Sequence, residues 1–357
     1  MTDDVGETSP VSTVEQTPFE TNILEQPEAL LRLAGAPAAR LDALTGNRWD
    51  RIVLTGMGSS HFAGTPTWRR LVALGHDAWT LDTGQLLDNH RLVTDATLLI
   101  VTSQSGASGE VRELLNLRRT GGIGPAVLVG VTNDDVSPLA EAADLFVPLH
   151  SGDEATVSTK SYLNTLAVHR LMAAAFAGEN VTAIQNVELG DAAEAVQGVI
   201  DQVNLDKYAL GAARHPARRL AYIGARDSAG TAEFAALITK EAAKVAAEGY
   251  VGGQFRHGPF ELAGDGLTVM IFAPERGRPD ASLRRLATDL VDTGSQVIVV
   301  GDVDCPATVS VAIGGTSNLA FAAASSVVAE LFAVDVARAN GVTPGAFVHG
   351  RKITTTT

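Results

Sequence analysis

The 357-residue chain contains one cysteine, Cys305, and this scarcity excludes several kinds of scaffold and site. A single thiol forms no disulfide within the chain and no zinc site built from several cysteines. It also suits a reducing compartment, so we expect the protein in the cytoplasm. The start of the chain agrees, because it is acidic and rich in Ser, Thr and Pro rather than basic and then apolar, as a secretory signal would be. We expect residues 1–20 to form a flexible tail.

Basic residues are also few. The chain carries 27 Lys and Arg against 41 Asp and Glu, which gives a net charge of −14. Nucleic acids and anionic membrane surfaces bind clustered Lys and Arg, so this balance argues against both partners. We also find no apolar run that approaches the length needed to cross a membrane. Hydrophobic residues nevertheless make up 45% of the sequence, enough for a large core and two domains.

The sequence offers no clear ligands for a metal or a dinucleotide. None of its eight histidines has the spacing of a His-x-x-x-His site, so we expect no metal. The segment Gly56-Met57-Gly58 could open a dinucleotide-binding turn, but His61 stands where the third glycine of that motif belongs. We therefore predict that the protein uses no cofactor.

What the chain does contain is a repeated alternation of strand and helix patterns. Short apolar, β-branched runs predict two series of strands, at 51–55, 78–81, 97–102, 126–131 and 145–148, and then at 219–223, 267–272, 296–300 and 307–313. Helical patterns separate these runs, with a leading helix over 19–33 and a linking helix over 186–204. This alternation is typical of an α/β fold with parallel sheets, and its recurrence indicates a tandem repeat. We place the first domain at 21–190, the second at 200–345 and a C-terminal tail at 346–357.

Polar side chains follow the strand predicted at 97–102, where the chain turns into the next helix. They are Ser103, Gln104, Ser105 and Ser108. Beyond the carboxyl end of a parallel strand, free N–H groups and the helix dipole favour an anion, and small hydroxyl side chains add donors without bulk. Ser is also a preferred helix cap, so capping alone would explain part of the pattern. Four polar side chains within six residues favour a phosphate site.

Two further turns repeat this arrangement. The first predicted strand ends in a Gly- and Ser-rich turn over 55–64, and the turn over 154–161 again places hydroxyls before a helix. Each of these turns, taken singly, is explained by helix capping. The second half of the chain has no Ser-Gln-Ser-Gly turn after the matching strand, so we expect the anion site in the first half only.

The three turns and two later segments form a series of five motifs along the chain. In order, the motifs are Gly56 to Gly64, Ser103-Gln-Ser-Gly106, Val157-Ser-Thr-Lys160, Thr239-Lys-Glu241 and Arg256-His-Gly-Pro259. By these motifs the chain resembles the tandem sugar isomerase (SIS) domain family, and especially the isomerase half of glutamine:fructose-6-phosphate amidotransferases and stand-alone deaminase-like relatives. The segments 22–27 and 350–354 also look like that group. The resemblance implies two flavodoxin-like α/β domains, a phosphosugar substrate and a homodimer that shares its active site across the interface.

The resemblance also assigns binding residues. It implies that the sugar phosphate is held by side chains of the three turns, namely Ser59, Ser60, Ser103, Gln104, Ser105, Ser108 and Ser158. Glu248 and Lys160 match family positions close to the site and are expected to support it indirectly. Lys160 could equally do no more than stabilise its turn.

Three residues are implied to carry the reaction. Glu241, on a helix predicted over about 229–249, matches a general base, since one carboxylate can move a proton between C1 and C2 of an open-chain sugar; alone, it could pair with Lys244 on a helix surface. His257 matches a histidine that opens the sugar ring in the neighbouring subunit, although a turn histidine bonded to backbone would look the same. Lys352 matches a lysine that forms an imine with the ketose, in a tail that would otherwise be a disordered basic end.

Several activities remain open at this point. Glucosamine synthesis from glutamine needs a glutaminase cysteine, and the sequence offers none at its start, so we expect the sugar half alone. Our first expectation is a glucosamine-6-phosphate deaminase, with a fructosamine-6-phosphate deglycase and an aldose-ketose isomerase of a sugar bearing a C6 anion as alternatives. A non-catalytic sugar-phosphate sensor is the alternative of another class, although the residues before 51 are too few and too acidic for a DNA-binding helix-turn-helix.

Overall fold

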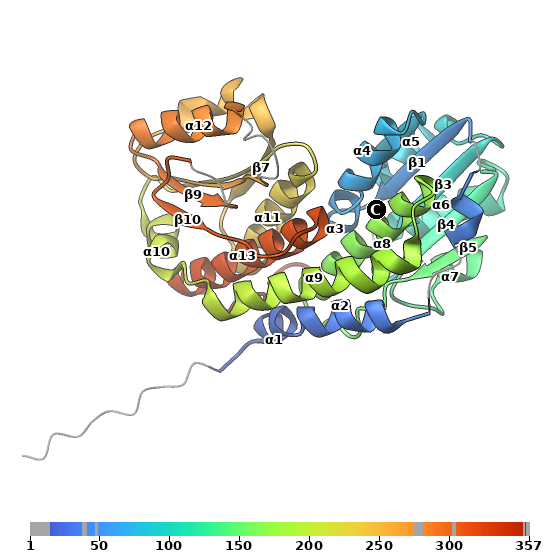
Figure 1. Cartoon of the computed structure of the whole chain (residues 1–357), viewed down its shortest axis with the longest axis horizontal. Helices are drawn as coiled ribbons and strands as arrows, with labels where there is room; N and C mark the ends of the chain where they lie inside the picture. The colour runs from blue at the N-terminus through green and yellow to red at the C-terminus, as the bar shows by residue number, and fades with distance from the viewer. Residues whose placement is uncertain are drawn as a thin grey trace, which may run out of the picture.

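The computed structural model describes residues 15–37, 41–46, 49–274, 281–301, 305–352 and 354. Within this part of the chain, two parallel five-stranded sheets lie side by side, each flanked by helices, and long helices run beneath both (Figure 1). The predicted α/β fold with two tandem parallel sheets is confirmed. Most of the expected tail lies outside the described residues, but its boundary at 20 is wrong, because a helix begins at Pro18 and Phe19 is fully buried.

The first sheet has the order β2-β1-β3-β4-β5 and is built from β1 (Arg51–Gly56), β2 (Ala78–Asp82), β3 (Thr97–Thr102), β4 (Val127–Thr132) and β5 (Leu145–Pro148). Every residue of β3 is buried, as expected for a central strand covered on both faces. The connecting segments are α3 (Ser59–Phe62), α4 (Thr65–Ala73), α5 (Thr83–Asp88), η2 (His90–Leu92), α6 (Gly109–Arg119), α7 (Pro138–Ala142) and α8 (Lys160–Phe176). Because β1 and β3 are neighbours, the turns that follow them meet at one edge of the sheet.

The second sheet has the order β10-β9-β8-β6-β7 and is built from β6 (Arg219–Gly224), β7 (Ala247–Val251), β8 (Leu267–Phe272), β9 (Gln296–Val300) and β10 (Val309–Val311). Its other elements are α10 (Asp206–Arg214), α11 (Ser228–Ala243), η3 (Gly252–Arg256), η4 (Pro259–Leu262) and α12 (Ala281–Asp292). The predicted strand at 307–313 is shorter, at Val309–Val311.

The helix predicted over 229–249 is wrong in its last part. It ends at Ala243, because Lys244 adopts a left-handed conformation with φ 58°, and the chain then enters β7 beside β6. The Ala-rich run around 242–247 favours a helix locally, but pairing with β6 overrides that preference. Gly249 permits the close packing of β7 on α11, since an added Cβ there would lie 2.7 Å from the Glu233 Cα.

A layer of helices joins the two halves. It consists of α1 (Pro18–Leu24), α2 (Gln26–Gly35), η1 (Leu41–Leu44), α9 (Val181–Gln202) and α13 (Asn318–Ala339). The leading helix predicted over 19–33 is two helices, and the linking helix predicted over 186–204 begins earlier, at Val181. Helix α13 packs against both α9 and α11, and one continuous cluster of buried side chains extends through both halves.

Helix α13 corrects the expectation that no apolar run reaches membrane-spanning length. An 18-residue window of this 22-residue helix has a mean hydropathy of 1.8, and α13 alone among the helices of the described part is long and apolar enough to cross a membrane. In this fold, however, 83% of its apolar window is buried inside the protein. A helix that is apolar on all sides is expected in the centre of a multi-layered core.

Glu330, fully buried in the middle of α13, yields a stability prediction. Desolvation and the nearby charge of Glu154 raise the pKa of Glu330 well above its ordinary value, although Gln26 Nε2 donates to its Oε2 at 2.5 Å. The contribution of the protonated Glu330 to the free energy of unfolding is therefore fully present below pH 4.5. It is lost, by about 1.4 kcal/mol per pH unit, as the pH rises toward the pKa of Glu330 in the folded state. We expect Glu330→Gln to be more stable than the wild type at pH 8 and close to it at pH 4.5.

Denaturant unfolding at both pH values measures this difference. The matched control is Glu28→Gln, which removes an exposed carboxylate from α2. A stability difference that is the same at both pH values would contradict the prediction.

Candidate active site

The hydroxyl-rich turn after β3 forms a cradle. Ser103, Ser105 and Ser108 each accept a hydrogen bond from a backbone N–H two or three residues further on, at N···O distances of 3.2, 3.3 and 3.4 Å. The capping role is therefore real, and Ser108 is the N-cap of α6. Among the described residues these hydroxyls donate to no protein acceptor, so their O–H groups remain available to an anion.

Glycine is required at the centre of this cradle. Gly106 has φ +60°, a conformation that L side chains rarely adopt. A Cβ added there would lie 2.2 Å from Ser137 Oγ, on the turn before α7. The cradle is thus packed tightly against the end of the neighbouring strand, which holds its hydroxyls in place.

The other predicted binding residues lie on the turns that follow neighbouring strands. Ser59 and Ser60 begin α3 directly after β1, and both are half-buried. The carbonyl of Gln104 accepts from Thr132 Oγ1 at 3.1 Å, which ties the cradle to β4. Ser158 is half-buried in the turn before α8. Their contact with a substrate stays a prediction.

Glu241 lies near the C-terminal end of α11, not near the middle of the longer helix that was expected. Burial raises the pKa of its carboxyl, and the charges of Lys352, Lys244 and Lys240 oppose that rise. The alternative expectation was a surface ion pair between the side chains of Glu241 and Lys244. Instead, Lys244 Nζ donates to the backbone carbonyl of Glu241. A half-buried carboxylate among cations is suited to accept and release a proton.

Lys352 is ordered by a carboxylate that the sequence did not single out. Its Nζ lies 2.7 Å from Glu154 Oε2, and the side chain of Glu154 is fully buried while that of Lys352 is 24% exposed. Desolvation would raise the pKa of Glu154, but the charge of Lys352 and the hydrogen bonds from Lys352 and Ser161 outweigh it and hold that pKa below its ordinary value. The sequence signal that could have found Glu154 is an acidic residue directly before the hydroxyl-rich turn that leads into α8.

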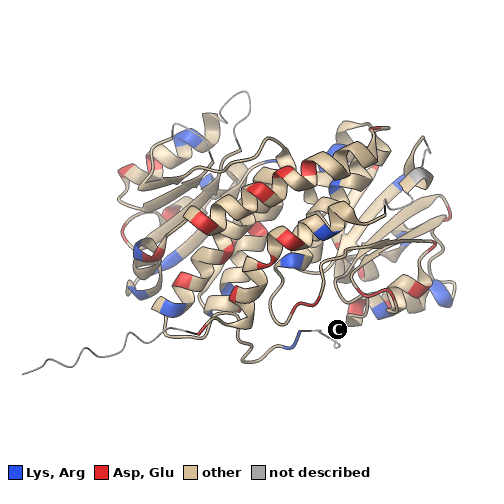
Figure 2. Ribbon diagram, turned by 60° about the horizontal axis from the view of Figure 1, so that its bottom comes forward, with Lys and Arg blue, Asp and Glu red and all other residues tan. Residues whose placement is uncertain are grey.

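The C-terminal tail brings Lys352 to the cradle. Two residues after Lys352, the carbonyl of Thr354 accepts from the N–H of Gly109, the first residue of α6, at 3.0 Å. Directly before the tail, Gly345 N–H donates to the carbonyl of Ala242, next to Glu241, at 3.3 Å. Figure 2 shows this tail passing from the long helices to the first sheet, with basic residues just before its end. This segment therefore links the end of α11, Lys352 and the start of α6.

Three predicted residues lie outside this cluster in the single chain. His257 is exposed at the end of η3, and its backbone N–H donates to Gln254. Glu248 is not on a helix with Glu241 but on the edge strand β7, where it is exposed and accepts from Tyr250 OH. Lys160 is buried and pairs with Glu25, so it joins α8 to the leading helices. The role of Glu248 as an indirect support of the site stays a prediction.

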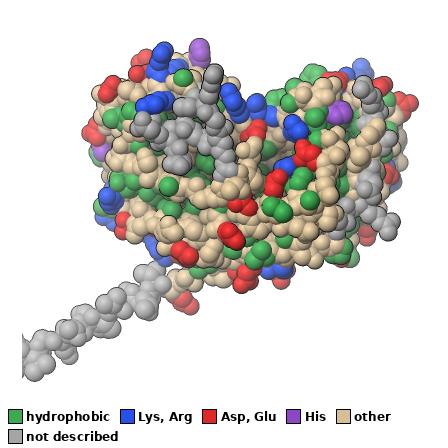
Figure 3. Space-filling view, in the orientation of Figure 1, with side chains coloured by type: hydrophobic (Ala, Val, Ile, Leu, Met, Phe, Trp, Pro, Cys, Tyr) green, Lys and Arg blue, Asp and Glu red, His purple; other side chains and the backbone are tan. Residues whose placement is uncertain are grey.

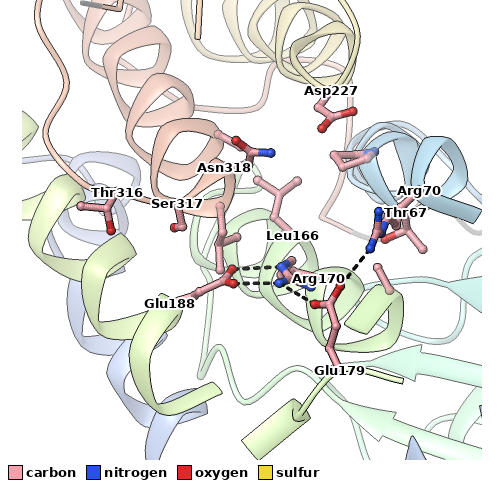
Figure 4. A pocket seen from close by; sticks show the side chains of 14 residues that line it. Thr67, Arg70, Leu166, Arg170, Glu179, Glu188, Asp227, Thr316, Ser317 and Asn318 are labelled. Atoms are coloured by element: carbon pink, nitrogen blue, oxygen red, sulfur yellow. Dashed lines mark hydrogen bonds and ion pairs between the residues drawn. The ribbon is translucent and has the colours of Figure 1, made fainter. Parts of the chain in front are cut away.

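A separate cavity of about 500 Å³ lies between the halves, among α4, α8, α9 and the start of α13. Figure 3 shows acidic and basic side chains gathered in the hollow between the two halves. Arg170 bonds Glu188 at 2.7 Å and Glu179 at 3.0 Å, and Arg70 bonds Glu179 at 3.0 Å (Figure 4). These charges satisfy one another, and none of the predicted site residues lines this cavity. The described residues also contain no group of three His, Cys, Asp or Glu placed to hold a metal.

Comparison with known proteins identifies the family of this chain. The SIS domain family matches residues 47–175 and 215–337, which cover both sheets and most of their helices. The chain belongs to the SIS domain family. A curated relative, the glutamine–fructose-6-phosphate aminotransferase of Caulobacter vibrioides, is 27% identical in an alignment of 313 positions that covers 80% of this SIS protein and 49% of the relative. The chain thus spans about half the length of that relative.

Solved structures repeat the same fold over nearly the whole chain. The C-terminal domain of glucosamine-fructose-6-phosphate aminotransferase from Francisella tularensis has a TM-score of 0.77 at 19% identity, covering 93% of this chain and 99% of that one. Tagatose-6-phosphate ketose/aldose isomerase from Escherichia coli gives 0.76 at 22%, covering 96% and 99%. Glucosamine-6-phosphate deaminase from Thermotoga maritima gives 0.69 at 20%, covering 95% and 100%. At these identities the likeness shows the fold alone.

Proposed function

We propose that this SIS protein is a phosphosugar-processing enzyme, and specifically a deaminase that converts glucosamine 6-phosphate to fructose 6-phosphate and ammonia. One observation carries the proposal: the tail binds the first residue of α6 beside the cradle and places Lys352 within reach of the charge of Glu241. In this proposal, the anion cradle, the half-buried Glu241 and Lys352 are the three parts of one site. A site that only sensed a phosphosugar would need the cradle but not the other two groups.

The proposed reaction is a proton shift followed by loss of nitrogen. With the phosphate in the cradle, Glu241 removes the proton from C2 of the open-chain aldose and delivers it to C1, while one N–H proton of the C2 amino group passes to O1. The product is the C2 imine of fructose 6-phosphate. Exchange of that imine onto Lys352 releases ammonia, and water then frees the ketose.

Ring opening is assigned to His257 from a second copy of the chain. In the single chain His257 is exposed and away from the contacts of Glu241 and Lys352, so a shared site in a cytoplasmic homodimer supplies its position. The deglycase and the isomerase use the same proton shift between C1 and C2. They differ from the deaminase because a fructosamine loses its amine from C1, whereas an aldose-ketose isomerase releases no group.

A panel of substrates tests the proposal. The purified full chain is incubated with glucosamine 6-phosphate, fructosamine 6-phosphates and aldose 6-phosphates, while ammonia and ketose are measured. We expect ammonia and fructose 6-phosphate in equal amounts from glucosamine 6-phosphate. Turnover of only a fructosamine or an aldose would replace the deaminase by the deglycase or the isomerase. If a phosphosugar binds and none is turned over, the protein is a sugar-phosphate sensor instead of an enzyme.

A further inference from the structure

Glu154 is the most strongly held carboxylate beside the reactive lysine. Its Oε1 accepts from Thr159 N–H at 2.7 Å, Thr159 Oγ1 at 3.0 Å and Ser161 N–H at 3.1 Å. Its Oε2 accepts from Ser161 Oγ and from Lys352 Nζ, each at 2.7 Å. Four of these five donors belong to the turn and first residues of α8. The carboxylate is therefore fixed even when the lysine moves away.

An ammonium group cannot attack a carbon, so Lys352 must lose a proton before it forms an imine. Among the described residues, the acceptor in direct contact with its Nζ is Glu154 Oε2. We propose that Glu154 is the base that takes this proton from Lys352 and returns it to the group that departs from C2. This role rests on the proposed function, because it requires Lys352 to react with the sugar.

The proton balance of this step is complete. Transfer within the pair converts the Lys352 ammonium and the Glu154 carboxylate to a neutral amine and a carboxylic acid. The amine attacks C2, and the acid returns its proton to the departing ammonia or, in the reverse direction from fructose 6-phosphate, to departing water. The protonated imine on Lys352 then faces a Glu154 carboxylate once more, and no other reactant is needed.

The surroundings of Glu154 accommodate both of its charge states. After the transfer, the three donors to Oε1 remain in place, and the new O–H on Oε2 points at a hydroxyl, Ser161 Oγ, that can rotate and accept. A bound sugar that excludes water from the 24% exposed Lys352 favours the neutral pair, since desolvation penalises two charges more than two neutral groups.

The ionisable groups around Glu154 separate its task from that of Glu241. Lys352 faces it from the tail, Glu241 from α11 and Glu330 from α13, and the buried Lys160 of α8 is occupied by Glu25. Burial raises the pKa of Glu241, whereas Lys352 and Ser161 hold that of Glu154 low. Two carboxylates with pKa values shifted in opposite directions are typical of sites with two acid-base roles.

The test is the pH dependence of imine trapping. The full chain is incubated with fructose 6-phosphate and sodium cyanoborohydride between pH 6 and 8, and sugar fixed on the Lys352 peptide is measured by mass spectrometry. In Glu154→Gln, Lys352 must give its proton to solvent. The ratio of the variant rate to the wild-type rate should therefore rise about tenfold per pH unit. Effects of pH on the substrate and the reagent cancel in this ratio.

Two further variants complete the design. Glu154→Asp retains a carboxylate and should keep a ratio independent of pH, even if its rate is lower. Glu179→Gln removes the same charge from the ion pairs of the separate cavity in Figure 4 and should trap as the wild type does. If Glu154→Gln does not fold, Glu154→Asp against Glu154→Ala gives the same comparison.

The outcomes separate this inference from the proposed function. A ratio that stays constant with pH would show that Glu154 only holds the lysine, and it would overturn the inference. Turnover of glucosamine 6-phosphate without any trapping on Lys352 would also overturn it, while leaving the deaminase intact. If no phosphosugar is turned over by the wild type, the proposed function itself fails.

Discussion

Glu241→Gln is expected to lower kcat for glucosamine 6-phosphate by a factor of about 10² to 10⁴, the usual contribution of a general base. Gln retains the size and polarity of the side chain but cannot carry the proton between C1 and C2. Binding should persist, because other residues build the cradle that we propose as the phosphate site. Steady-state kinetics, together with the rise in melting temperature on adding fructose 6-phosphate, measure the two effects separately.

The same residue predicts the acid limb of the pH profile. Glu241 acts as a base only when ionised, and burial raises the pKa of its carboxyl from the ordinary value of 4.5. Activity should therefore be lost as the pH falls through a value above 4.5. The control is Glu194→Gln, an exposed position on α9. Wild-type turnover in Glu241→Gln would remove Glu241 from the mechanism.

Phe234→Ala is expected to reduce the free energy of unfolding by about 3–5 kcal/mol, as is usual for a buried phenyl ring. Phe234 of α11 is fully buried and stacks on Tyr162 of α8, with ring centroids 3.6 Å apart and planes within 3°. The stack joins a helix of the first half to a helix of the second. Denaturant unfolding monitored by circular dichroism gives the magnitude.

This loss should also affect activity. Tyr162 adjoins Ser161, which holds Glu154, and Phe234 lies on the helix that carries Glu241. Removing the ring of Phe234 should therefore weaken the packing of α8, in the first half, against α11, which carries Glu241. Phe234→Leu leaves a smaller cavity and should lose less stability and less activity. A cost below about 1 kcal/mol for Phe234→Ala would show that other contacts hold the halves together.

The first half of the fold was predictable because its signals are local. Short apolar runs such as 97–102 are typical of central strands that are buried on both faces. A serine directly before a helix caps it, because its hydroxyl accepts a hydrogen bond from the backbone N–H three residues further on. The strand β7 was missed for the opposite reason. Its Ala-rich approach has a local helix preference, and only its pairing with β6 and its packing on α11 make it a strand.

The sequence by itself determined the α/β class, the tandem repeat and the position of the hydroxyl-rich turn after β3, because each depends on interactions between residues close together in the chain. Only the tertiary structure decided the state of the ionisable groups. Lys352 and Glu154 are 198 residues apart, and Glu330 and Gln26 are 304 apart. Charge and burial act through space, so which carboxylate meets the lysine, and which is left in an apolar core, follows from packing that no local pattern records.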